Sequence, residues 1–310
     1  MKSKTNPLAR RQWLKRSAAI SLAGWLAAPL RSWSDDAAEA KTDLPYLDRI
    51  GLQLYTVRDQ MAKDPKATLK AVAEAGYKQV ELMSVDDASL EIAAIARDHG
   101  MRVHSAFINW KCIASPEKND GIDVAKTIEL GERIGLRHLV FGYIDKQSRG
   151  TADQCKAIAD RANVAAEATR DAGMRMAYHN HSFEFGPFDG GKQNAFDIFI
   201  ERFDPQLMDF ELDVFWAKIG GYDPFDLMKR LAGRITMMHL KDLKPKTPVI
   251  FDEGKVPKDA FQECGDGSID MPAVMRLAKE IGALECHVEQ DQSPDPIKSI
   301  GQSFQFLSKA

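Results

Sequence analysis

Residues 64–82 read DPKATLKAVAEAGYKQVEL, and this stretch contains one complete passage from helix to strand. Asp64 and Pro65 provide an N-cap and a first-turn proline for a helix over residues 67–75. Gly76 is the residue type that ends helices, and the run 77–82 predicts a strand. The stretch therefore predicts a helix, a glycine stop and a strand in direct succession.

The same succession recurs after residue 49 and sets the fold class. Further helical segments stop at Gly100, Gly135, Gly173, Gly233 and Gly282. Eight strands are expected, over residues 50–57, 77–82, 102–107, 138–142, 175–180, 208–213, 235–240 and 285–289. Eight such units predict an α/β protein with one (β/α)8 TIM barrel. No G-x-G-x-x-G motif follows the first strand and no P-loop occurs, which argues against an open nucleotide-binding sheet.

The first forty residues have the layout of a secretory signal. Arg10 and Arg11, followed by Gln12-Trp13-Leu14-Lys15, resemble the twin-arginine export pattern. Residues 17–30 form a short apolar run, and residues 38–40 read Ala-Glu-Ala, the form of a cleavage site. We expect cleavage near Ala40, a periplasmic product and one barrel domain over residues 41–310. The alternative is an amphipathic or membrane-anchoring helix, although fourteen apolar residues are too few to span a bilayer.

Charge and cysteine usage narrow the class of partner. Without residues 1–40 the chain has 35 Lys and Arg against 42 Asp and Glu, a net charge near −7. This acidic balance argues against nucleic-acid binding, and we expect no membrane contact after cleavage. The cysteines are widely spaced without a C-x-x-C motif, which argues against a zinc–thiolate site. They are expected to be mostly core residues, at positions 112, 155, 264 and 286.

Metal-ligating side chains stand at the ends of three consecutive strands. Asp213, His239 and Glu289 each follow an apolar strand segment, and the chemistry of a barrel lies where its strands end. Taken singly, His239 could be a core histidine, Asp213 a loop cap and Glu289 a partner of Lys241. Their joint occurrence predicts one divalent ion. Oxygen and imidazole donors suit Mn²⁺, Mg²⁺, Co²⁺ or Zn²⁺, and a carboxylate-rich set favours manganese or magnesium, with manganese as the first candidate.

Four short motifs carry a family resemblance. Residues 212–216 (LDVFW), 238–242 (MHLKD), 265–270 (GDGSID) and 288–289 (VE) resemble the sugar phosphate isomerase/epimerase group of the xylose-isomerase-like TIM barrels. Residues 76–82 are similar to that group's second strand, and the resemblance spans residues 48–308. It implies a metal held by Glu, Asp, His and Glu from strands five to eight. It also implies a small hydroxy-ketone sugar as substrate.

Strand five departs from the family pattern. Relatives have a Leu-Glu-Asn-His stretch with Glu as ligand, whereas this chain reads Tyr178-His179-Asn180-His181. Either His179 replaces that Glu, or Glu184 ligates after a turn of the chain. We favour Glu184, because a third carboxylate better holds a hard cation. The expected metal ligands are then Glu184, Asp213, His239 and Glu289.

The remaining site residues follow from this assignment. His181 is expected to be the acid or base, with His179 as its partner or substitute and Glu289 also passing a proton. A sugar pocket would be lined by Glu81, His104, Trp216 and Lys241. The sequence does not decide whether the protein forms a homo-oligomer.

Three functions compete. The first is a metal-dependent isomerase or epimerase that acts on a keto sugar through an enediolate. The second is a lyase or dehydratase that uses the same enolate chemistry on a 3-keto-glycoside or inosose. The third is a noncatalytic sugar-binding barrel. Replacing a catalytic Glu by His weakens the epimerase alternative, because it changes the base.

The export signal has a direct test. N-terminal sequencing of protein recovered from the periplasm is expected to begin near residue 41. Exported protein that still begins at Met1 would contradict the predicted cleavage.

Overall fold

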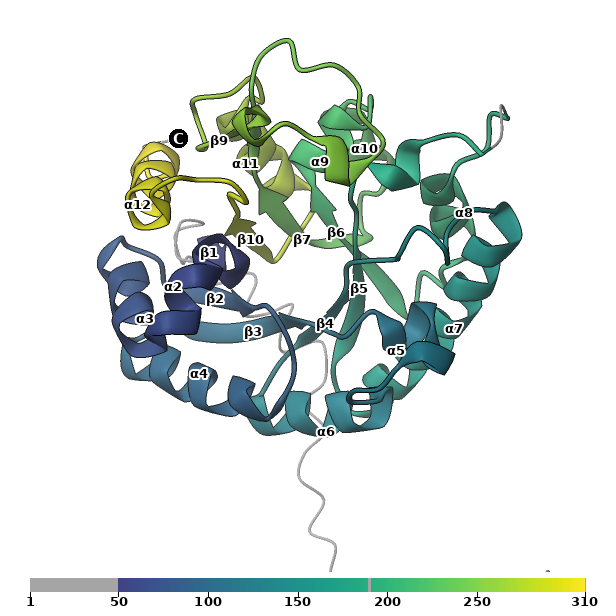
Figure 1. Cartoon of the computed structure of the whole chain (residues 1–310), viewed down its shortest axis with the longest axis horizontal. Coiled ribbons are helices and arrows are strands. Elements are labelled where there is room, and N and C mark those ends of the chain that lie inside the picture. Colours follow the sequence, from purple (N-terminus) through teal and green to yellow (C-terminus); the bar gives the residue numbers. More distant parts are fainter. Residues whose placement is uncertain (1–49, 189–190, 310) are drawn as a thin grey trace, which may run out of the picture. The chain divides into compact units, whose positions relative to one another are not determined.

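The computed structural model describes residues 50–188 and 191–309, so the predicted signal peptide lies outside the described residues. Eight parallel strands close into a barrel in the order β1-β10-β7-β6-β5-β4-β3-β2, surrounded by helices (Figure 1). The predicted TIM barrel is confirmed. Its strands are β1 (Ile50–Gln53), β2 (Gln79–Leu82), β3 (Arg102–Phe107), β4 (His138–Phe141), β5 (Arg175–His179), β6 (Met208–Asp213), β7 (Ile235–Leu240) and β10 (Glu285–Val288).

The helices follow the strands with the predicted caps and stops. Asp64 Oδ1 accepts a hydrogen bond from the Ala67 amide at 2.9 Å, and Pro65 opens α3. All six glycines predicted as helix stops have a positive φ, as a left-handed helix end requires. The α-helices are α2 (Arg58–Lys63), α3 (Pro65–Glu74), α4 (Asp87–Asp98), α5 (Lys111–Ala114), α6 (Val124–Ile134), α7 (Ala152–Asp171), α8 (Ala195–Arg202), α9 (Val214–Ile219), α10 (Pro224–Arg230), α11 (Met271–Glu280) and α12 (Pro296–Leu307).

Shorter elements lie mostly in the loops. The 3-10 helices are η3 (Leu54–Val57), η4 (Pro116–Lys118), η5 (Phe183–Phe185), η6 (Glu253–Lys255) and η7 (Lys258–Ala260), and an antiparallel pair joins β8 (Asp242–Leu243) to β9 (Phe261–Gln262). None of the helices in the described ranges is long and apolar enough to cross a membrane.

Strands three, six and seven have the predicted bounds, whereas the first strand is four residues shorter than predicted. Its end is set by Gln53, whose side-chain oxygen accepts a hydrogen bond from the Tyr55 amide at 3.0 Å. That bond turns the chain into η3. Tyr55 consequently leaves the barrel wall and stands 44% exposed beside the mouth.

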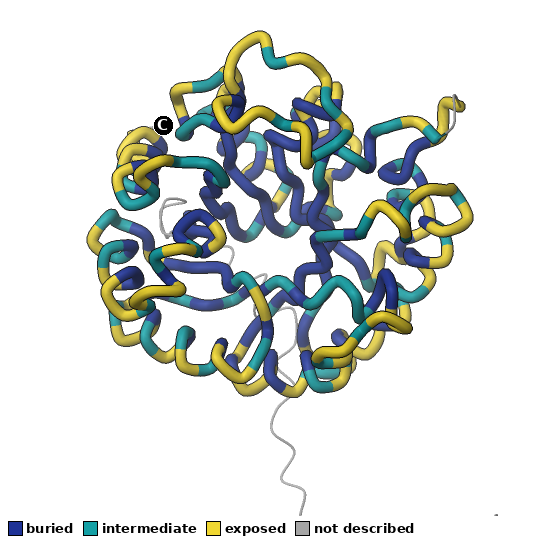
Figure 2. Tube along the Cα trace, viewed as in Figure 1, coloured by how far each residue is buried: buried dark blue, intermediate teal, exposed yellow. Residues whose placement is uncertain are grey.

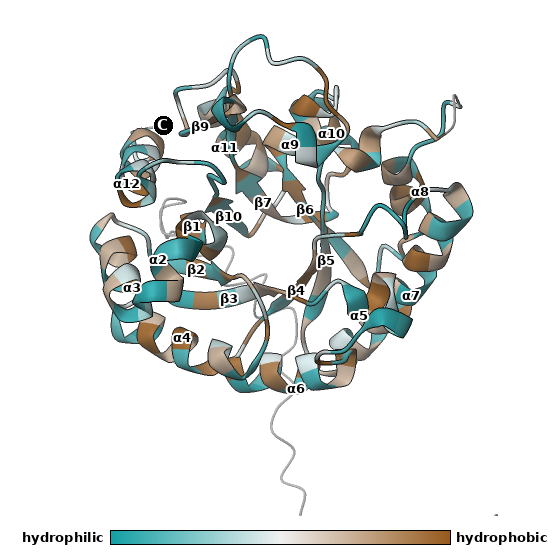
Figure 3. Ribbon diagram, in the orientation of Figure 1, coloured by the Kyte–Doolittle hydropathy of each residue, from teal (hydrophilic) through white to brown (hydrophobic). Residues whose placement is uncertain are grey.

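The apolar core lies between the strands and the helices. Buried residues follow the barrel strands, and exposed residues follow the outer turns of the helices (Figure 2). The helices carry both hydrophobic and hydrophilic residues, as expected for helices with one face on the barrel (Figure 3). A second, much smaller apolar cluster is separate from this core. It consists of Val140, Ala177 and Met237, with Phe107 packed against them.

Polar side chains cross the inside of the barrel, where TIM barrels usually place bulky aliphatic residues. His239 Nε2 on β7 lies 2.8 Å from Glu81 Oε1 on β2, and both side chains are fully buried. Because β7 and β2 are not neighbours in the barrel order, this contact spans the interior. The strands are therefore linked by ionisable groups along the barrel axis.

One glycine makes room for this polar interior. Gly51 pairs with His287 in the sheet, and a Cβ at Gly51 would lie 2.6 Å from His287 Cδ2. We expect Gly51→Ala to lower the free energy of unfolding by about 1–3 kcal/mol, as overpacking does. A urea titration measures this change.

The matched control is Gly301→Ala in α12, where an added Cβ meets nothing within 4 Å. Removing a glycine from a helix interior is expected to raise the free energy of unfolding by about 0.5–1 kcal/mol. Equal effects of the two substitutions would contradict the packing argument.

Candidate metal centre and active site

Four donor side chains converge at the carboxyl ends of neighbouring strands. They are His179 at the end of β5, Asp213 at the end of β6, His239 on β7 and Glu289 just after β10. All four are buried, and their ligand atoms lie within 4.8 Å of one another. Three of the four predicted ligands thus meet, and the fourth donor is the alternative His179.

The two carboxylate oxygens of Asp213 have different surroundings. One caps a helix, and the other faces the candidate metal centre. Oδ1 accepts a hydrogen bond from the Trp216 amide at 2.8 Å and so caps α9. Oδ2 is buried and makes no hydrogen bond among the described residues, and only the Lys241 ammonium, 3.4 Å away, offsets its charge. A buried carboxylate oxygen left in this state is costly, whereas a bound cation would satisfy it. The residues present therefore fit a divalent metal ion.

The charges around the centre fit the same conclusion. Lys241 Nζ lies 2.6 Å from Glu289 Oε2, 3.4 Å from Asp213 Oδ2 and 3.2 Å from Asp291 Oδ2. Burial lowers the pKa of Lys241, but these carboxylates outweigh it and raise that pKa, so Lys241 stays charged. Burial raises the pKa of Asp291 to about 7, against the opposing effect of Lys241. Asp213 and Glu289 are two carboxylates that share one ammonium, so a bound cation would find negative charge at this point.

Glu184, the favoured fourth ligand, is not brought to this cluster. Its Oε1 accepts a hydrogen bond from the Tyr178 hydroxyl at 2.7 Å, and both oxygens accept from the His181 amide at 3.0 Å. Burial raises the pKa of Glu184 to about 7, although these hydrogen bonds act to lower it. The carboxylate therefore closes the turn after β5, and His179 takes the fourth place among the converging donors that was expected for Glu184.

His181 lies in the pocket above the centre. Its ring stacks on Phe183 at a centroid distance of 5.7 Å and packs against Trp216 at 5.1 Å. Burial, with the neighbouring His179 and Lys241, holds the pKa of His181 well below its usual value. The side chain is thus a neutral imidazole next to the candidate ligands.

The pocket has a volume of about 830 Å³ and opens over the carboxyl ends of the strands. Among the predicted site residues, it is lined by His179, His181, Trp216, Lys241 and Glu289. Aromatic side chains that the sequence did not single out for the pocket also line it. These are Tyr55, Phe107, Trp110, Tyr143 and Phe261.

A half-buried ion pair stabilises one wall of the pocket. Arg149 Nη2 lies 2.6 and 2.8 Å from the two carboxylate oxygens of Glu253, which joins the loop after β4 to the loop after β7. The Arg149 guanidinium also lies 3.3 Å from the ring centroid of Phe183.

Glu81 and His104 do not line the pocket, which corrects their predicted role. Glu81 is fully buried beneath the centre, where it accepts one hydrogen bond from Gln53 and contacts His239. His104 Nδ1 lies 2.8 Å from Glu285 Oε1, at the start of β10 and so at the opposite end of the barrel. The third strand continues to Phe107, and that side chain reaches the pocket instead.

A second buried group lies below the centre and was missed as a group. Glu81, Glu211, His239 and His287 have ligand atoms within 4.8 Å of one another. The two-residue period of strands could have indicated it. Glu211 precedes Asp213 by two residues, and His287 precedes Glu289 by two, so each points to the same side as a candidate ligand.

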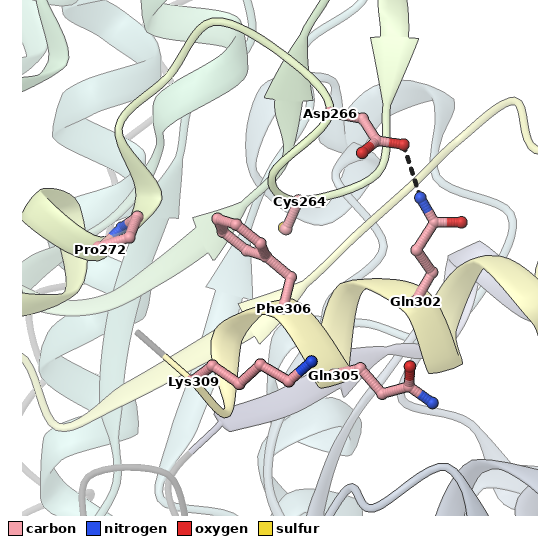
Figure 4. A pocket seen from close by; sticks show the side chains of 7 residues that line it. All are labelled: Cys264, Asp266, Pro272, Gln302, Gln305, Phe306 and Lys309. Atoms are coloured by element: carbon pink, nitrogen blue, oxygen red, sulfur yellow. Dashed lines mark hydrogen bonds between the residues drawn. The ribbon is translucent and has the colours of Figure 1, made fainter.

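A smaller hollow of about 420 Å³ lies outside the barrel, beside α12 (Figure 4). Gln302 donates a hydrogen bond to Asp266 across it at 2.6 Å, and Phe306 covers Gly265. Burial raises the pKa of its Cys264 thiol, which disfavours the nucleophilic thiolate form. All four cysteines are free of disulfides, and three are buried, as the core prediction requires.

Comparisons with known proteins agree with this architecture. A family model described as xylose isomerase-like TIM barrel matches residues 69–310. The inosose dehydratase of Geobacillus kaustophilus (strain HTA426) is 28% identical over 294 residues, which cover 85% of this chain and 86% of that protein. A sugar phosphate isomerase/epimerase structure from Parabacteroides distasonis ATCC 8503 has a TM-score of 0.70 at 22% identity, covering 87% and 96% of the two chains. The probable 3-DHS dehydratase AsbF from Bacillus anthracis has a TM-score of 0.62 at 11% identity, covering 84% and 98%.

The position of Glu184 gives a prediction that separates its two roles. Glu184→Gln is expected to keep its metal, because the carboxylate serves the turn, whereas Asp213→Asn should lose it. Metal analysis of the purified variants measures this directly. A Glu184→Gln protein without metal would restore the ligand role.

The same variant has a signature in pH. The pKa of Glu184 in the folded state, about 7, lies above its value in the unfolded chain. The folded state therefore keeps the Glu184 proton to a higher pH. Wild-type stability should therefore fall by about 1–3 kcal/mol as pH rises from roughly 4.5 to 7, and Glu184→Gln should lack that part of the fall. Urea titrations across this range compare the two proteins.

Proposed function

Because the chain belongs to the xylose isomerase-like TIM barrel family, we propose that it is a metal-dependent dehydratase of a keto sugar or inosose. The observation that carries the proposal is the convergence of His179, Asp213, His239 and Glu289 on one point under the pocket. His181 and Lys241 stand beside that point as a neutral imidazole and a charged ammonium.

The four converging side chains would hold the ion. When bound, a divalent cation supplies a Lewis acid for the negative charge that develops on the substrate's carbonyl oxygen. Two imidazoles and two carboxylates suit Mn²⁺, Co²⁺ or Zn²⁺ better than Mg²⁺, which prefers oxygen ligands. We retain manganese as the first candidate.

The proton chemistry falls to the pocket residues. His181 takes the proton from the carbon beside the ketone, and the electrons of that C–H bond form the double bond of the enolate. The enolate then re-forms its carbonyl and expels the hydroxyl of the next carbon. His181 returns the proton to that hydroxyl, so one water leaves. The Lys241 ammonium stabilises the negative charge that develops on the oxygens.

Two observations favour dehydration over epimerisation. An epimerase of this group is expected to pass a proton between two glutamates, and here the strand-five donor is His179. The relative that matches 85% of this chain is named an inosose dehydratase. Isomerisation or epimerisation is the second candidate, favoured by the presence of two acid–base groups, His181 and Glu289, in one pocket.

The pocket lining favours an uncharged sugar over a sugar phosphate. Aromatic rings cover much of its wall, and no arginine lines it among the described residues. Lys146 is engaged with Asp252 at 2.7 Å and Lys241 with three carboxylates, which leaves Lys258 at the exposed rim. We place the protein in the periplasm, on the strength of residues 1–40 alone.

The test is a substrate screen with the manganese-loaded protein in D₂O. Inososes, 3-keto-glycosides and ketohexoses are followed by mass spectrometry and NMR. Dehydration gives a product lighter by one water, and epimerisation gives deuterium at carbon without loss of mass. A protein that exchanges no proton on any of these keto sugars would contradict both, and favour a noncatalytic binding barrel.

Two variants assign the roles. His181→Ala should lower turnover by about 10²–10⁴-fold, the usual contribution of a general base, while keeping its metal. The matched control is His99→Ala, which changes a histidine at the end of α4 outside the pocket and should leave turnover unchanged. Full activity of His181→Ala would remove it from the mechanism.

A further inference from the structure

The buried group below the candidate metal centre could, from its donor types alone, hold a second ion. Glu81, Glu211, His239 and His287 are all fully buried. Glu211 Oε1 and Oε2 and His287 Nδ1 have no hydrogen-bond partner among the described residues. The separation between His287 Nδ1 and Glu211 Oε1 is 3.5 Å, longer than a good hydrogen bond. The choice between an ion and protons depends on the tautomers of the histidines.

The tautomer of His287 is fixed from the far end of the barrel. Gln79 Nε2 lies 2.8 Å from Glu285 Oε2 and 2.8 Å from His287 Nε2. A carboxylate only accepts hydrogen bonds, so the amide must present its NH₂ group to Glu285. The same NH₂ then donates to His287 Nε2, and the ring proton belongs on Nδ1. A protonated nitrogen cannot ligate, so His287 is a donor toward Glu211 and no metal ligand.

The tautomer of His239 follows by the same reasoning. Its Nε2 lies 2.8 Å from Glu81 Oε1, which also accepts a hydrogen bond from Gln53 Nε2 at 2.8 Å. Both ring nitrogens face a carboxylate, which only accepts hydrogen bonds, so without a metal both carry a proton. Nε2 keeps its proton toward Glu81, and the proton on Nδ1 is the one that a metal would replace. Nδ1 faces the centre, 3.1 Å from Glu289 Oε2 and 3.8 Å from Asp213 Oδ2.

Glu211 occupies the corresponding place beneath the other histidine. Its Oε2 lies 3.3 Å from His179 Nδ1 and 3.4 Å from His239 Nε2, and its Oε1 faces His287 Nδ1. Three ring nitrogens thus surround one buried carboxylate. With the His179 proton directed to Glu211, Nε2 is the nitrogen of that ring available for a metal.

We propose that Glu81 and Glu211 are positioning residues that determine which ring nitrogen of His239 and His179 faces the metal, and that the lower group holds no second ion. This rests on the proposed function, because it assumes a metal at the upper group. Carboxylates that accept the second ring N–H of a ligand histidine fix its tautomer and orientation, and their loss typically lowers metal affinity 10–100-fold.

The test measures affinity for Mn²⁺ itself, by competition with a fluorescent chelator, in the full chain. Wild type should bind one ion per chain. Glu81→Met and Glu211→Met remove the acceptor at nearly constant length and should weaken binding about 10–100-fold. Glu81→Gln and Glu211→Gln keep one acceptor oxygen and should recover part of that loss. If these residues only stabilised the fold, the Met and Gln variants would not differ in Mn²⁺ affinity in this way.

The control is Asp209→Leu, which removes a buried carboxylate paired with Arg175 and absent from both buried groups. It should destabilise the fold and leave Mn²⁺ affinity unchanged. A readout without any variant is the ¹⁵N spectrum of the histidine rings in the manganese-free protein loaded with diamagnetic Zn²⁺. It should show His239 protonated at Nε2.

The outcomes separate the two proposals. Unchanged affinity in both Met variants, with wild type binding one ion, overturns the positioning role and leaves the proposed function standing. Two ions per wild-type chain, one of them lost in Glu211→Met, overturns the single-ion inference. A wild-type chain that binds no metal overturns this inference together with the metal dependence of the proposed function.

Discussion

The contact between His239 and Glu81 is the interaction on which the rest of the interior depends. It joins β7 to β2 across the barrel axis, and both side chains are fully buried. A buried carboxylate without a partner costs several kcal/mol, and the same holds for a buried charged imidazole. Glu81 and His239 therefore compensate each other's burial. The other ring nitrogen of His239 in turn contacts Glu289 in the candidate metal centre above them. These buried polar groups stabilise one another along the barrel axis. At the mouth, the carboxylates of Asp213 and Glu289 share the single ammonium of Lys241.

The two-residue period of a strand explains how one barrel provides both layers. Glu211 and Asp213 lie on the same side of β6, and His287 and Glu289 follow the same side of β10 and its continuation. The residue nearer the mouth is the candidate ligand, and the residue two positions earlier lies beneath. Gly51 leaves the space that His287 occupies. The fold thus determines the layering, and residue identity at alternate positions determines the chemistry.

The fold was predictable because its signals are local, whereas part of the site was not. Gly76 and its counterparts mark the turns into six of the eight barrel strands, and Asp213, His239 and Glu289 stand at strand ends. Glu184 lies away from the converging donors because its carboxylate accepts hydrogen bonds from Tyr178 and the His181 amide in the turn after β5, and the spacing of these residues does not reveal that turn. His104 lies in the first half of β3, where its ring meets Glu285 at the start of β10, so it is too far from the carboxyl end of the strand to reach the pocket. Glu211 and His287 could have been found by extending the strand period inward.

The imidazole on β5 changes the chemistry that the centre can support. A neutral histidine in place of a glutamate removes one negative charge from the donor set, so a bound divalent ion retains more positive charge toward the substrate. That charge stabilises an enolate more strongly. The same replacement removes a carboxylate that could take or return a proton on that side, which leaves His181 as the nearest base. A stronger electrophilic centre without a carboxylate on the β5 side is suited to eliminating water, since elimination needs the proton returned to the departing oxygen rather than to the opposite face of the carbon.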